Sequence, residues 1–183
     1  MSQIYTFNNE RDLFTTTASN TSTLGEYKFS SVFVRPGFPV TTTVTSPEGN
    51  EGTIYWKEHA IEVGGVKHVV EDLQQKQSRF KSPHSRRWVL AKNQWQTKYI
   101  SRTQSWKVSS VQDDRSAPSP AVEFTPYRSK TFGKADPATL LVSVPDGDSI
   151  FLVLILIYSH LTELPQPSLL SGFWTLSWLL NGS

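Results

Sequence analysis

The sequence predicts a mainly β domain in which an antiparallel, barrel-like sheet encloses one hydrophobic α-helix near the C-terminus. Thr, Val, Tyr, Phe, Trp and Ile recur in short runs as far as Val144, and these residue types favour strands. A continuous apolar run, residues 150–158, follows these strands after a turn. A helix that is apolar on every side must be surrounded by protein, and a curved sheet can surround it.

The predicted strands are separated by residues that favour turns. The Gly64-Gly65 pair is the clearest hairpin turn, because glycine supplies the positive φ angles that primed turns require. Residues 46–50 have turn composition, Lys92-Asn93 is expected to be a tight turn, and residues 70–73 to form a short helical turn. We expect strands at residues 4–7, 24–34, 40–45, 52–57, 60–63, 66–69, 87–90, 94–100, 106–111, 122–125 and 139–144.

The enclosed helix is predicted at residues 149–164, with Ser149 as its N-cap and Pro165 beyond its end. Its apolar run is shorter than the roughly 20 residues that a membrane-spanning helix needs, so no transmembrane span is expected. Two alternatives remain, a membrane-inserted segment and a buried strand, because β-branched residues also suit a strand. The preferred interpretation requires residues 150 to about 163 to be hidden from both water and lipid.

The length of 183 residues suits one domain, which we place at residues 1–164. The chain has no cysteine, which excludes disulfides and thiolate metal sites and fits a reducing compartment. Its N-terminus lacks the basic stretch and apolar run of a secretory signal. We therefore expect a cytoplasmic protein that can lie peripheral to a membrane.

A second apolar segment, the tail at residues 165–183, carries no charged side chain. At helical spacing its large apolar residues gather on one side, opposite Ser171, Gly172 and Thr175. The tail is expected to pack on the sheet, to contact a membrane interface or partner groove, or to be a disordered end. Its candidate contact residues are Phe173, Trp174 and Trp178.

Signatures of catalysis are missing from the sequence. It contains no G-x-S-x-G elbow, no phosphate-binding loop and no dinucleotide-binding glycine motif. The histidines are His59, His68, His84 and His160, and none is paired at a metal-binding spacing. His160 is expected to be a hydrogen-bonded histidine in the core or at its rim. We predict no enzyme activity, no catalytic residue, no cofactor and no metal site.

The formal charge of +2 is unevenly distributed, since no acidic residue occurs between Asp72 and Asp113. Alternate residues of a strand share a face, so Arg86 and Arg87 must point to opposite sides. Tryptophans and tyrosine interleave with these cations, which suits a lipid interface. The alternative is a solvated outer face, and nucleic acid is not an expected partner. The cations of this stretch are Lys76, Arg79, Lys81, Arg86, Arg87, Lys92, Lys98, Arg102 and Lys107.

Several short segments occur in the order typical of one known family. They are Thr41-Thr42-Thr43-Val44, Gly52-Thr53-Ile54-Tyr55-Trp56, Ile61-Glu62-Val63-Gly64-Gly65, Val69-Val70-Glu71-Asp72-Leu73, Ser78-Arg79-Phe80, Arg87-Trp88, Gln94-Trp95 and Pro137-Ala138-Thr139-Leu140. In these segments the chain resembles the fungal family of uncharacterised domains called DUF6593, over roughly residues 20–164. That family is similar in architecture to tubby-like and LURP-one-related proteins, in which a β-barrel encloses a hydrophobic C-terminal helix. The resemblance implies the same barrel and supplies no catalytic residue.

These observations together predict a non-enzymatic binding module for anionic phospholipid headgroups. The candidate contacts are Lys81, Arg86, Arg87 and Lys92, which cluster around one predicted hairpin. The alternative is a protein-interaction or structural domain that buries its apolar tail against a partner or a second copy.

Overall fold

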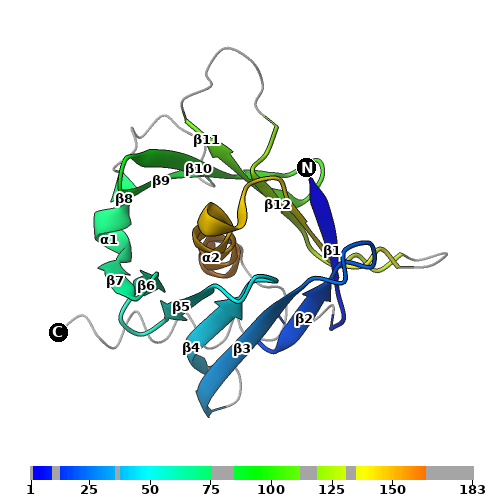
Figure 1. Cartoon of the computed structure of the whole chain (residues 1–183), viewed down its shortest axis with the longest axis horizontal. Coiled ribbons are helices and arrows are strands. Elements are labelled where there is room, and N and C mark those ends of the chain that lie inside the picture. Colours follow the sequence, from blue (N-terminus) through cyan, green and yellow to red (C-terminus); the bar gives the residue numbers. More distant parts are fainter. Residues whose placement is uncertain are drawn as a thin grey trace.

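A computed structural model describes residues 2–9, 13–35, 38–75, 85–111, 119–130 and 135–163 (Figure 1). Within these ranges the fold is mainly β, with one antiparallel sheet and a long helix near the C-terminus. The elements are β1 (Gln3–Phe7), β2 (Thr16–Ser19), β3 (Glu26–Arg35), β4 (Phe38–Thr45), β5 (Glu51–Tyr55), β6 (Ala60–Val63), β7 (Val66–Val69), α1 (Val70–Leu73), β8 (Gln74–Gln75), β9 (Ser85–Leu90), β10 (Asn93–Ile100), β11 (Ser105–Ser110), β12 (Val122–Thr125), β13 (Thr139–Val142) and α2 (Asp146–Glu163).

The sheet is a meander whose first and last strands pair with each other. Consecutive strands pair from β1 through β7, and consecutive strands pair again from β8 through β13. An antiparallel β1·β13 ladder, from Gln3↔Val142 to Thr6↔Thr139, joins the two halves. The halves therefore meet at the N-terminal strand and lie on opposite sides of α2 (Figure 1).

The predicted barrel is not closed in the described part of the chain. Strands β7 and β8 are the two edges of the 13-stranded sheet, and α1 lies between them. In α1, Gln74 N–H donates to the carbonyl of Val70, and Val70 N–H donates to the carbonyl of His59 at 2.8 Å, so the helical residues extend neither edge as a strand. Val70 and Leu73 are buried, and α1 covers the core between the two edges.

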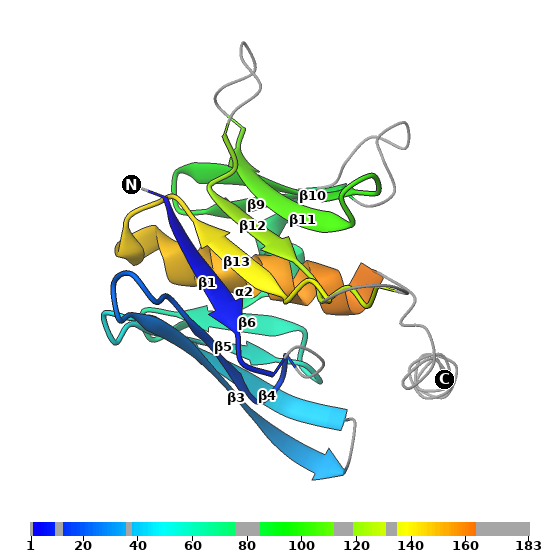
Figure 2. The same cartoon turned by 90° about the vertical axis from the view of Figure 1, so that its right-hand side faces the viewer.

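Helix α2 runs through the middle of the curved sheet (Figures 1 and 2). Every residue from Ile150 to Ser159 is at most 4% exposed. The prediction of an enclosed helix is confirmed for these residues, and the alternative of a buried strand is wrong. The enclosure ends earlier than expected, because His160 and Leu161 are only half-buried and Thr162 is exposed.

The start of α2 differs from the prediction of an N-cap at Ser149. The helix begins at Asp146, and Asp148 N–H donates to the carbonyl of Pro145 at 3.2 Å. Acidic residues are favoured in a first helical turn, where they oppose the positive end of the helix dipole. Ser149 lies inside the helix instead, and its hydroxyl accepts a hydrogen bond from Tyr27 at 3.0 Å.

Most of the turns predicted from the sequence are present in the structure. Gly64 and Gly65 have φ angles of 59° and 76°, as the predicted primed turn between β6 and β7 requires. The predicted short helix at residues 70–73 and the turn at residues 46–50 are also present. The β9–β10 turn lies one residue earlier than predicted, because Ala91 takes the positive φ, at 54°. Strands β2 and β8 were not predicted.

Candidate binding surfaces

Of the four cations predicted to form one site, the three that the structure describes do not converge. Arg86 lies opposite Thr97, which is fully buried, and shares a face with the fully buried Trp88. It therefore lies on the inner face of the sheet, whereas Arg87 lies on the outer face. Lys92 is exposed in the turn at the far end of β9, and Lys81 lies outside the described residues.

Arg86 contributes to an interior cluster near the end of α2. The ring of Tyr158 stacks on Trp56, with centroids 5.8 Å apart, and meets Trp88 edge-on at 6.0 Å. His59 Nδ1 lies 3.1 Å from the Tyr158 hydroxyl. Burial raises the pKa of Tyr158 above its ordinary value, while Arg86 lowers that pKa and Glu71 raises it. This cluster holds the last turns of α2 in place.

A different set of cations shares the outer face of β9, β10 and β11. We call Arg87, Lys98 and Lys107 the basic face. Lys98 lies directly opposite Lys107 across the β10–β11 ladder, and Arg87 is diagonal to Lys98 on the next strand. These three strands contain no acidic residue. On the neighbouring β12, Glu123 pairs with Lys107 at 3.2 Å.

The sequence contains a signal for this arrangement. Lys98 and Lys107 are placed symmetrically about residues 101–104, which form the turn of the β10–β11 hairpin. Residues at such positions face each other across a hairpin ladder. This symmetry would have predicted that Lys98 and Lys107 face each other if the turn had been located in the sequence.

A second exposed feature is apolar. We call Val32, Phe33 and Val34, near the end of β3, the apolar hairpin tip. Their exposed fractions are 62%, 38% and 81%. The tip lies at the end of the molecule where α2 ends (Figure 2). Three consecutive exposed apolar residues near a hairpin end are a candidate contact surface.

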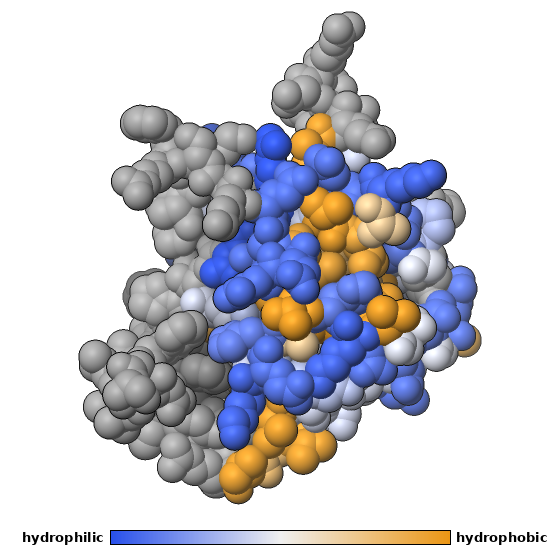
Figure 3. Space-filling model, turned by 90° about the vertical axis from the view of Figure 1, so that its left-hand side faces the viewer, coloured by the Kyte–Doolittle hydropathy of each residue, from blue (hydrophilic) through white to orange (hydrophobic). Residues whose placement is uncertain are grey.

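The face that carries α1 and β7 also exposes apolar side chains (Figure 3). There they form separate patches between polar residues. Strand β7 contributes Val66 and Val69, which are 54% and 46% exposed. Scattered apolar residues of this kind are normal on a protein surface.

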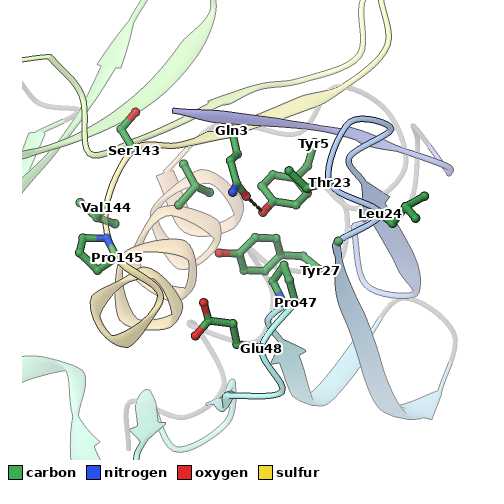
Figure 4. A pocket seen from close by; sticks show the side chains of 12 residues that line it. Gln3, Tyr5, Thr23, Leu24, Tyr27, Pro47, Glu48, Ser143, Val144 and Pro145 are labelled. Atoms are coloured by element: carbon green, nitrogen blue, oxygen red, sulfur yellow. Dashed lines mark hydrogen bonds between the residues drawn. The ribbon is translucent and has the colours of Figure 1, made fainter. Parts of the chain in front are cut away.

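A pocket of about 550 Å³ opens where α2 begins (Figure 4). The Tyr27 hydroxyl donates to Ser149, and the Tyr5 hydroxyl donates to Gln3. Glu48 is the one charged side chain among the lining residues, all of which the structure describes. The pocket therefore has no cationic side chain to attract an anionic ligand.

The described histidines do not form a metal site. Within the described ranges, no group of three or more His, Asp or Glu residues is arranged to hold a metal ion. His160 packs edge-on against Phe124, with ring centroids 5.0 Å apart. Its buried Nδ1 has no hydrogen-bond partner among these residues, and the hydrogen bond expected for this histidine stays a prediction. Burial lowers its pKa to about 4.

No family model, curated protein or solved structure matches the chain. The resemblance to DUF6593 therefore stays a prediction from the sequence. Neither helix in the described ranges has the length and apolar character to cross a membrane. Phe173, Trp174 and Trp178 lie outside the described residues, so their role in partner or membrane contact also stays a prediction.

Proposed function

We propose that the chain is a non-enzymatic module whose basic face attaches to anionic phospholipid headgroups at the cytoplasmic surface of a membrane. The observation that carries this proposal is the position of Lys98 directly opposite Lys107. Like charges opposite each other on neighbouring strands repel, and a bound phosphate group offsets that repulsion. A cation near an anionic membrane contributes about 1 kcal/mol of binding.

We also propose that the curved sheet and its central helix form a tubby-like fold, as the resemblance to DUF6593 implies. The burial of Ile150 to Ser159 and the β1·β13 pairing support this assignment. The unpaired edges at α1 are a departure from the closed barrel of that architecture.

Vesicle co-sedimentation tests the lipid proposal. The chain is expected to bind phosphatidylserine vesicles, to ignore phosphatidylcholine vesicles, and to dissociate as salt rises from about 0.1 to about 0.5 M. Lys98→Glu replaces an attraction with a repulsion. It should weaken binding by about 2 kcal/mol, or roughly 30-fold.

Lys28→Glu is the matched control for that variant. Lys28 is an exposed cation on β3, in the opposite half of the sheet, so the substitution changes the net charge equally (Figure 1). We expect this control to bind almost as tightly as the unmodified chain. Equal losses in the two variants, or equal recovery on both kinds of vesicle, would remove the basic face as the binding site.

A further inference from the structure

We propose that the apolar hairpin tip is the docking site for the chain's own C-terminal tail, residues 165–183. This inference concerns a surface on the half of the sheet opposite the basic face (Figure 1). It does not depend on lipid binding. A docked tail would explain why this hairpin exposes three consecutive apolar residues.

The tip belongs to a stretch of hairpin that extends past the strands beside it. On one side, the β2 ladder stops at Thr16↔Phe29. On the other side, β5 reaches only Thr41 of β4, although β3 and β4 stay paired as far as Arg35↔Phe38 (Figure 2). Beyond the Val32↔Thr41 pair, where β5 still lies beside β4, no described strand flanks this stretch. A two-stranded ribbon by itself is marginal in water, so its apolar residues gain from a covering segment.

The tail begins within reach of this hairpin. Phe33 contacts Phe14 with ring centroids 5.9 Å apart, Phe14 contacts Trp56 at 6.2 Å, and Trp56 stacks on Tyr158 at 5.8 Å. These contacts connect the tip to the last turns of α2, which ends at Glu163. Ten extended residues span roughly 33 Å, which is more than three ring-to-ring steps.

The composition of the tail matches that of the tip. No residue of the tail is charged, and none of the three tip residues is polar. A covalently attached segment also has a high effective concentration, of millimolar order for a short linker. Docking within one chain therefore prevails over pairing of two chains at micromolar protein. The large apolar residues of the tail are Leu169, Leu170, Phe173, Trp174, Leu176, Trp178, Leu179 and Leu180.

The absence of cysteine makes a direct test possible, because a single introduced thiol takes up a label uniquely. We would attach a nitroxide to full-length Ser171→Cys protein, enriched in ¹⁵N, and measure paramagnetic broadening of backbone amide signals without vesicles. The amide signals of Val32 to Val34 should fall below half their diamagnetic intensity. Those of Val66 and Val69, which are also exposed and apolar, should keep theirs.

Two further samples separate the possible occupants. The double variant Val32→Ser, Val34→Ser changes exposed side chains only, so it should fold normally and lose the broadening. A mixture of labelled unenriched chains and unlabelled ¹⁵N chains should show none. Broadening in that mixture assigns the tip to a second copy and overturns the proposal, as does an unaffected tip in the labelled chain. Lys98→Glu should leave the broadening unchanged, which keeps this result separate from lipid binding.

Discussion

The two ends of α2 are held by different chemistry. At its beginning, a neutral hydrogen bond from Tyr27 to the buried Ser149 attaches the helix to β3. Near its end, Tyr158 lies among aromatic rings beside the exposed His59, and the half-buried His160 has no partner for Nδ1 among the described residues. The bond at the first end joins two neutral hydroxyl groups, whereas the second end has two histidines beside the aromatic rings. The effect of pH on stability that comes from a histidine is therefore expected at the end of α2.

The largest effect is expected where α2 touches the sheet most closely. A Cβ atom on Gly52 of β5 would lie 2.5 Å from Leu154 Cδ1 and 2.7 Å from Ile150 Cγ2. Gly52→Ala should therefore lower the free energy of unfolding by about 3 kcal/mol, measured by urea denaturation. Gly147→Ala, near the start of α2, is the control because its Cβ would meet nothing within 4 Å. Equal denaturation midpoints for the two variants would contradict this packing.

A pH effect should come from the end of α2. Burial lowers the pKa of His160 to about 4, below the 6.5 of an unfolded chain, so the folded protein binds fewer protons. The contribution of His160 to the free energy of unfolding is therefore fully present above pH 6.5 and is lost as the pH falls toward 4. The loss is expected to be about 2–3 kcal/mol, since the residue keeps some contact with solvent.

Comparison with His160→Leu separates the contribution of His160 from that of carboxyl groups that titrate over the same pH range. Urea denaturation at pH 7 and pH 4.5 should show a smaller loss of stability for the variant than for the unmodified chain. Parallel losses for both proteins would show that His160 is not the titrating group.

The smallest effects are expected from two hydroxyl deletions. Tyr27→Phe should cost about 1.5 kcal/mol, because Ser149 is fully buried and cannot replace the lost bond with one to bulk water. Tyr158→Phe should cost about 0.5 kcal/mol, because His59 is exposed and can bond to water instead. Both changes in the free energy of unfolding would be measured by urea denaturation at pH 7. The reverse order would mean that the end of α2, rather than its beginning, is the more firmly held.

The sequence predicts most of the core because short segments of the sequence determine its main elements. An apolar run with no polar side has to be enclosed, and Leu152 to Ile157 are fully buried. The Gly64-Gly65 pair fixes one hairpin through its positive φ angles. Closure of the barrel could not be predicted in this way, since it depends on whether β7 and β8 approach each other across α1.

The candidate site was less predictable than the core. Proximity in the sequence grouped Arg86 with Arg87, although the pleat sends the first inward and the second outward. Assembly of the basic face depends on the register of β10 against β11, which brings Lys98 opposite Lys107. The turn at residues 101–104 sets this register, and the composition of the basic stretch does not locate that turn. The polar run Thr16 to Ser19 likewise forms β2 only because β1 and β3 pair with it.

Amide hydrogen exchange tests most directly whether the sheet encloses α2. The amides of Leu152 to Ile157 should exchange only through global unfolding, with a free energy equal to that from urea denaturation. Those of His160 to Thr162 should exchange much faster, because the enclosure ends at Ser159. Exchange of the Leu152 to Ile157 amides at the rate of the last turn, well before global unfolding, would contradict the enclosure.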